Sequence, residues 1–267
     1  MSRAALWRQE GNVKESERRA EEIFDGAVEE GCQRGRGKNM LPLWGPEDSF
    51  HFNPLLLKNA IHSQYFQKCC QTLTDWNAVI DEIYLEVKHV QPFSSPMDKT
   101  PSTAFCLLLR LLTLRMTDHQ MELTLKHPDS PYIRAIGFLY LRFVGPPDQI
   151  LHWIEPYLFD HEPIQVEGGQ RAPTTTIGEF VRNIFDARDY FGTPFPRYPI
   201  QTERDLRVRL LAAEKIAKRA AQHFRNKGCM RHFQTLGSEV MALYGDEENP
   251  TTWYRAVVDR VLTKDED

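Results

Sequence analysis

Apolar residues recur at helical spacing along most of the chain. Between positions 76 and 87 the apolar side chains share one face, and charged residues share the opposite face. This pattern is typical of an amphipathic helix with one buried side. The stretch 102–116 is apolar nearly all round apart from Arg110 and Arg115, which predicts a helix at the centre of the fold.

Polar residues at the expected helix starts support the same interpretation. Asn53 and Ser130 each precede a proline, and such pairs suit the cap and first position of a helix. Thr74 is placed to cap the amphipathic helix. The spacings Thr117–Gln120 and Thr176–Glu179 match capping boxes, in which two side chains satisfy backbone N–H groups reciprocally.

The helical period breaks in three places. In 162–176, Ile164 and Val166 alternate with polar residues before two glycines, which predicts a small β-hairpin. The stretch 192–200 holds three prolines and should be extended. After 237 the period changes to two, and a polar turn separates two β-prone runs, which predicts a second hairpin.

These patterns predict a mainly α protein. Its body should be a compact multi-helix domain with one small β-hairpin insertion, followed by a C-terminal β-hairpin. The expected segments are a flexible arm at 1–38 with a short helix within 16–28, a helical domain at 39–203, a basic helix at 204–232 and a β segment at 233–267.

Composition narrows the class of protein. The 267 residues carry a net charge of -4 with 41% hydrophobic and 26% charged side chains, as in ordinary globular proteins. Binding of nucleic acid by overall positive charge is therefore excluded. Five cysteines without paired spacing indicate reduced thiols inside the cell. No apolar run suits a signal peptide or a membrane span, so no membrane partner is expected.

Motifs of catalysis are missing. The chain has no nucleophile elbow, dinucleotide-binding glycine pattern or P-loop, and the stretch 35–38 lacks the spacing that a phosphate-binding loop needs. Cys229 and His232 lie near His223, but no fourth ligand for a closed zinc site follows. We therefore expect no catalytic residue, no cofactor and no metal, and hence no enzyme.

One charged region stands out in the C-terminal third. Its basic residues outnumber the acidic ones, so they either contact RNA phosphates or an acidic partner or form a solvated helix face. They are Arg204, Arg207, Arg209, Lys215, Lys218, Arg219, Arg225, Lys227 and Arg231.

Several long blocks of sequence resemble the pre-mRNA-splicing factor 38 family, most closely its B-type branch. They include NMLPLWG at 39–45, STAFCLLLRLLTLRMT at 102–117, SPYIRAIGFLYLRF at 130–143 and FPRYPI at 195–200. The resemblance runs from about 39 to 205. It implies a non-catalytic helical scaffold of the spliceosome, located in the nucleus, that acts by protein–protein contacts around spliceosome activation. It also implies helical and zinc-finger splicing factors as partners.

The C-terminal segment departs from that family, whose members often end in Arg/Ser-rich tails. The stretch 236–261 instead resembles the opening of a Tudor-like barrel, and we expect a hairpin or a partial barrel there. Such barrels hold methylated Arg or Lys in aromatic cages through cation–π attraction. By that resemblance Tyr244, Trp253 and Tyr254 are cage candidates. Direct RNA binding through the basic helix and the Gly/Arg-rich stretch at 31–39 remains the alternative function.

Overall fold

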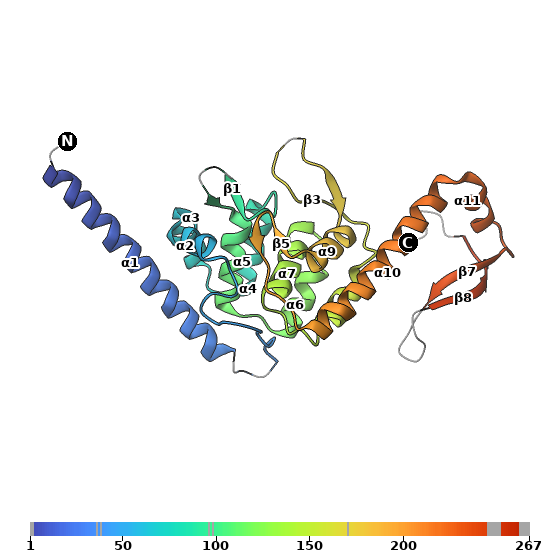
Figure 1. Ribbon diagram of the computed structural model, residues 1–267, viewed down its shortest axis with the longest axis horizontal. Helices are drawn as coiled ribbons and strands as arrows, with labels where there is room; N and C mark the ends of the chain where they lie inside the picture. Colours follow the sequence, from blue (N-terminus) through green and yellow to red (C-terminus); the bar gives the residue numbers. More distant parts are fainter. Residues whose placement is uncertain are drawn as a thin grey trace. The chain divides into compact units, whose positions relative to one another are not determined.

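The computed structural model describes residues 3–35, 37, 39–95, 97, 99–169, 171–244 and 252–261. The chain divides into two compact units, Met1–Leu210 and Leu211–Asp267, which are described separately. Figure 1 shows their helices and strands. The turn expected between the last two strands lies outside the described residues.

Helices dominate the first unit. They are α1 (Arg3–Arg34), α2 (Pro54–His62), α3 (Gln64–Lys68), α4 (Trp76–Glu86), α5 (Thr103–Leu114), α6 (Asp118–Leu125), α7 (Pro131–Val144), α8 (Ile150–Ile154), α9 (Ile177–Asp186) and the beginning of α10 (Ile200–Arg225). Two short 3₁₀ turns are η1 (Cys70–Thr72) and η2 (Glu155–Tyr157).

Antiparallel strand pairs interrupt the helices. In the first unit they are β1 (Phe93–Ser95) with β2 (Thr100–Pro101), β3 (Pro163–Gln165) with β4 (Thr174–Thr176), and β5 (Asp189–Tyr190) with β6 (Thr193–Pro194). The second unit adds α11 (Lys227–Phe233) and the pair β7 (Glu239–Tyr244) with β8 (Thr252–Val257). The mainly α fold with small hairpins is confirmed, and the body has two hairpins beyond the one expected at 162–176.

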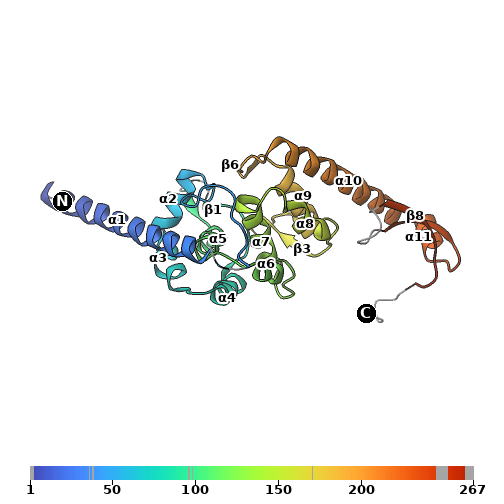
Figure 2. The same ribbon diagram turned by 90° about the horizontal axis from the view of Figure 1, so that it is seen from below.

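Helices α5 and α7 form the centre of the first unit. Every residue from Ala104 to Leu114 and from Ile133 to Val144 is buried, as the apolar stretch predicted for α5. The two helices contact each other, and α1, α4, α6 and α9 pack around them. Figures 1 and 2 show this arrangement from two sides. No described helix has the length and apolar character needed to cross a bilayer.

Most predicted caps are present. The side chains of Asn53 and Ser130 cap α2 and α7, and Thr117 forms a complete capping box with Gln120. Asp75 rather than Thr74 caps α4, since its carboxylate accepts from the Ala78 N–H at 3.0 Å.

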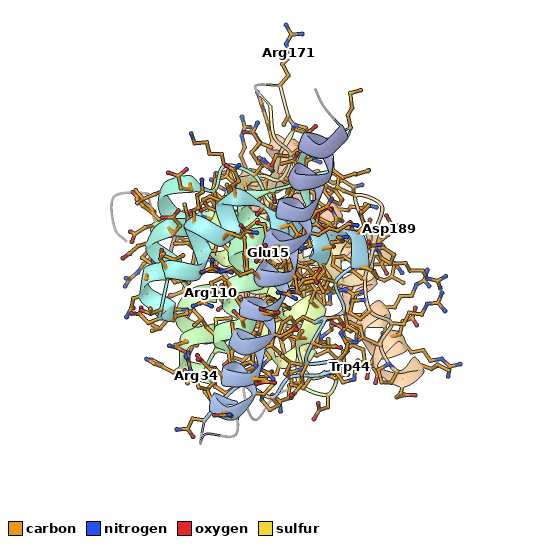
Figure 3. The ribbon with its side chains drawn as sticks, turned by 90° about the vertical axis from the view of Figure 1, so that its left-hand side faces the viewer. Glu15, Arg34, Trp44, Arg110, Arg171 and Asp189 are labelled. Carbon is orange, nitrogen blue, oxygen red and sulfur yellow. The ribbon has the colours of Figure 1, made fainter. Side chains whose placement is uncertain are left out.

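The N-terminal segment differs most from the prediction. Instead of a flexible arm with a short helix, α1 runs continuously for 32 residues and packs on α5 and α2. Figure 3 looks onto this helix, with Glu15 near its middle and Arg34 near its end. Phe24 is buried, and the centroid of its ring lies 6.4 Å from that of Phe66. Gly31 lies against the Thr113 carbonyl. Tertiary contacts therefore make this segment part of the helical body.

The boundary expected at 203/204 also moves. Helix α10 begins at Ile200, and its Leu206 and Leu210 are buried, so its first turns belong to the first unit. The expected basic helix is two helices, because the Asn226 side chain accepts from the backbone N–H groups of Gly228 and Cys229 and starts α11.

Candidate protein-binding surfaces

The predicted basic residues differ in exposure and in their ion pairs. In the first unit Arg204 and Arg207 are exposed, whereas Arg209 is half-buried and pairs with Glu155. In the second unit Lys218 pairs with Glu214 at 2.5 Å. The other predicted residues of that unit are exposed: Lys215, Arg219, Arg225, Lys227 and Arg231.

The predicted aromatic cage is divided by the strand register. Tyr254 lies opposite Ala242, so Tyr244, two residues along, shares its face of the hairpin; the two rings are 6.1 Å apart. Trp253 lies opposite Leu243, on the other face, where Arg219 sits 5.6 Å from its ring. The described hairpin brings together two of the three candidates, and a cage of all three would need further strands.

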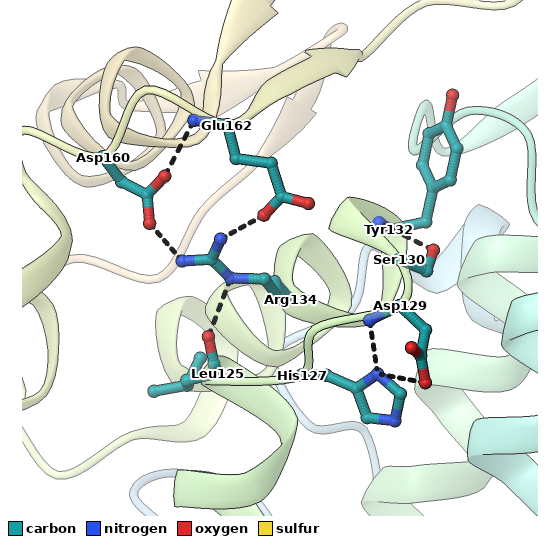
Figure 4. A network of polar contacts seen from close by, with 8 residues as sticks. All are labelled: Leu125, His127, Asp129, Ser130, Tyr132, Arg134, Asp160 and Glu162. Atoms are coloured by element: carbon teal, nitrogen blue, oxygen red, sulfur yellow. Dashed lines mark hydrogen bonds and ion pairs between the residues drawn. The ribbon is translucent and has the colours of Figure 1, made fainter. Parts of the chain in front are cut away.

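A buried ion-pair network fixes the base of the β3–β4 hairpin. Arg134 on α7 is 9% exposed and pairs with both Asp160 and Glu162, which precede β3 (Figure 4). Its Nε also donates to the Leu125 carbonyl at 2.8 Å. Each of these carboxylates contacts the guanidinium, so the buried positive charge of Arg134 is paired. We assign it a structural role.

Two cavities border the link between α9 and α10, and Ala187 lines both. The first cavity, of about 440 Å³, is rich in arginine: Arg142, Arg188, Arg197 and Arg207 line it together with Asp186 and Glu203. Apart from Arg207, sequence reasoning did not identify these arginines. The one available signal was Arg142, a charged residue inside the apolar block 130–143.

Arg142 is held in a defined orientation. Its Nε donates to the Ile184 carbonyl at 2.9 Å, and its two Nη atoms donate to the carbonyls of Pro196 and Ala187 at 2.9 and 3.2 Å. The guanidinium lies 4.3 Å from the ring of Phe195 and 4.7 Å from that of Tyr198. Burial lowers the pKa of Arg142, because the charged form loses hydration.

The second cavity, of about 430 Å³, has an apolar and acidic lining. Phe180, Tyr190 and Phe191 contribute aromatic rings, and Glu167 and Glu179 contribute carboxylates. Phe191 is 44% exposed and forms the β5–β6 turn with Gly192; their φ values are 50° and 75°. A bulky side chain is rare at positive φ, so the turn carries this ring at a conformational cost.

Reactive groups are sparse in the part of the chain that the structure describes. No group of three or more His, Cys, Asp or Glu side chains there is arranged to hold a metal ion. His232, considered above as a ligand, donates to the Glu239 carbonyl at 3.0 Å. Burial raises the pKa of Cys106 to about 11, which leaves its thiol protonated at neutral pH.

Comparison with protein families gives a match over this helical body. The model of the PRP38 family matches residues 41–207. The chain belongs to the PRP38 family. The match runs from the segment that precedes α2 to the first turns of α10, and it includes both cavities of the α9–α10 link.

Two PRP38-type relatives show the level of similarity. The chain is 37% identical to pre-mRNA-splicing factor 38B of Homo sapiens over 190 residues, which are 64% of this chain and 35% of that protein. It is 42% identical to pre-mRNA splicing factor SR-like 1 of Arabidopsis thaliana over 152 residues, 57% of this chain and 38% of that protein. The chain thus spans little more than a third of these relatives.

The fold of the PRP38 body is also found in a solved structure. A chain of the crystal structure of the Snu23-Prp38-MFAP1(217-258) complex of Chaetomium thermophilum matches with a TM-score of 0.53 and 18% identity. The match covers 64% of this chain and 94% of that one. At this identity the comparison establishes the fold. The matches described here do not confirm the Tudor-like likeness of the C-terminal segment, which stays a prediction.

Proposed function

We propose that the chain is a non-catalytic scaffold of the spliceosome that works in the nucleus by binding other splicing proteins. Membership of the PRP38 family over 41–207 carries the proposal, since the two relatives above are named pre-mRNA-splicing factors. The matched solved structure is itself a complex with other named proteins, which supports protein partners. We place its action around spliceosome activation, with helical and zinc-finger splicing factors as partners.

The two cavities of the α9–α10 link are the contact surfaces that we favour. They offer cationic, acidic and exposed aromatic groups beside the same link, and protein partners recognise such mixed surfaces. Phe191 supplies the exposed aromatic ring, a residue type that often dominates binding energy.

Affinity purification of the full chain from nuclear extract tests the proposal. Splicing proteins should co-purify, and depletion of the protein should stall splicing complexes before they mature, with recovery on adding the wild-type chain back. Phe191→Ala should weaken co-purification, whereas Leu55→Ala, an equally exposed apolar residue on α2, should not. Normal maturation after complete depletion would contradict the scaffold function.

Direct RNA binding is the second candidate function, and the exposed basic residues of α10 and α11 favour it. Arg36 and Lys38 of the Gly/Arg-rich stretch lie outside the described residues. Binding through phosphates should weaken steeply as salt rises, because cations are released from the RNA. Replacing Lys215, Arg225 and Lys227 by glutamine should reduce that salt dependence. RNA affinity unchanged by the triple replacement would eliminate this candidate.

A further inference from the structure

Buried arginines in the first unit have partners of different kinds. Among the described residues, Arg110, Arg115, Arg134 and Arg142 are the buried ones. Arg115 pairs with Glu47 at 3.1 Å, and Arg134 pairs with two carboxylates. Arg110 donates to the Leu73 carbonyl, and neither cavity described above reaches it. Arg142 alone of the four combines burial with a position in the lining of a described cavity.

No carboxylate in the described part of the chain lies within ion-pair distance of Arg142; Glu203, which lines the same cavity, acts on its charge from further away. Its side chain bonds to three backbone carbonyls, and the residue is only 4% exposed. A guanidinium has five N–H donors; three go to these carbonyls and a fourth is within reach of the Tyr198 hydroxyl, which leaves one for another acceptor. A buried charge is stable when it is paired, and a neutral carbonyl compensates it less than a carboxylate does. The cavity provides the space for such a partner.

The rim of the cavity repeats the positive charge. Arg188, Arg197 and Arg207 are exposed there, and with Arg142 they outnumber Asp186 and Glu203 by two charges. The nearest rim pair, Arg188 with Glu203, is 3.9 Å apart and 81% and 51% exposed, so it neutralises little. The cavity thus has a cationic base and a cationic rim.

The aromatic rings of this cavity argue against a nucleotide. Phe185, Phe195 and Tyr198 are all buried, and the last two face the Arg142 guanidinium. Single-stranded nucleic acid is bound by stacking bases on accessible rings, which these walls lack. A carboxylate needs only the guanidinium donors.

We propose that this cavity binds an acidic side chain of a partner protein, with Arg142 at its base and Arg197 and Arg207 at its rim. The proposal rests on the function proposed above, and names the chemistry of one contact within it. Arg142 donates to the incoming carboxylate through its remaining N–H, and the rim arginines attract the acidic segment before it docks.

Fluorescence anisotropy with the full chain tests the assignment. The probe is a labelled short peptide of alternating glutamate and glycine, and its matched control has glutamine in place of glutamate. Arg197→Gln and Arg207→Gln should each weaken binding of the glutamate peptide about threefold, as expected for exposed ion pairs. Arg204→Gln removes the same charge from α10 outside the cavity lining and should leave binding unchanged.

The buried arginine needs a second measurement, since its replacement can disturb folding. The Arg142 Nε–H signal in a ¹H–¹⁵N spectrum, assigned by its loss in Arg142→Lys, should shift on addition of the glutamate peptide and stay in place with the glutamine peptide. This readout uses the wild-type chain. The exposed Arg204, which lies outside the cavity lining, provides an internal reference for non-specific charge effects.

Three outcomes would overturn the proposal: equal affinity for both peptides, unchanged affinity in the Arg197→Gln/Arg207→Gln double variant, or displacement of the glutamate peptide by single-stranded RNA at lower concentration with the same dependence on the rim arginines. If the peptide tests fail but splicing proteins co-purify equally with the double variant and with the wild type, the cavity proposal is wrong and the scaffold function is not contradicted. If no splicing protein co-purifies with either chain, the scaffold function is contradicted.

Discussion

Two glycines of α1 allow the packing of that helix to be tested with the same substitution. Gly26 is exposed, and a methyl group there would meet nothing within 4 Å. At Gly31 the added Cβ would lie 2.1 Å from the Thr113 carbonyl oxygen of α5. Alanine favours a helix over glycine at both positions, so the difference between the two variants isolates the contact with α5.

The expected energies follow from this geometry. Gly26→Ala should stabilise the protein by about 0.5–1 kcal/mol through helix propensity alone. Gly31→Ala should be less stable than Gly26→Ala by about 1–3 kcal/mol, because the clash with backbone forces the helices apart. Complete undocking of α1 sets the upper limit, and the exposure of Phe24 contributes about 1.5–3 kcal/mol to it.

Urea denaturation of the full-length variants, followed by circular dichroism, measures the difference in unfolding free energy. Hydrogen exchange of the α1 amides then shows whether Gly31→Ala loosens that helix selectively. Equal stability of the two variants, with equal protection of α1, would refute the close approach of α1 and α5. A fall in protection at α1 alone would confirm that α1 docks on α5. It would also show that undocking α1 costs less free energy than unfolding the whole first unit.

Three further substitutions test other parts of the fold. Arg134→Met should lower the unfolding free energy by about 3–5 kcal/mol, because it leaves the carboxylates of Asp160 and Glu162 without their partner, and thermal denaturation at neutral pH measures the loss. Burial lowers the pKa of His89 from its ordinary value of 6.5, so the unfolded chain binds a proton at a higher pH than the folded chain does. The unfolding free energy should therefore fall as the pH drops below 6.5. His89→Gln should flatten this decline, as measured by urea titrations above and below pH 6.5. Thr117→Ala removes the capping box of α6 and should cost about 1 kcal/mol in the same titrations, and no loss would contradict the cap geometry.

Local sequence patterns predicted the features that depend on near neighbours. The apolar stretch 102–116 gave a helix buried on every side, and Asn53, Ser130 and Thr117 gave helix starts that the structure contains. These signals are readable because a helix face or a cap involves residues three or four positions apart. The hairpin at 162–176 followed from alternation and two glycines for the same reason.

The features that sequence missed depend on contacts between distant segments. Three glycines and a mixture of charges weaken the intrinsic helix preference of α1, so its length follows from packing on α5 and α2. The Arg142 site is assembled from α7 and carbonyls 42 to 54 residues further along. No local pattern indicates which carbonyls meet a given guanidinium.

The β5–β6 turn places stability and recognition in opposition at one residue. Asparagine or glycine would suit the positive φ of Phe191 better than phenylalanine does. A library selected only for heat resistance should therefore replace Phe191 early, and the enriched chains would lose the exposed ring beside the second cavity. Thermostable variants obtained in this way would fold well while binding poorly, which makes the turn a position to hold constant in any such selection.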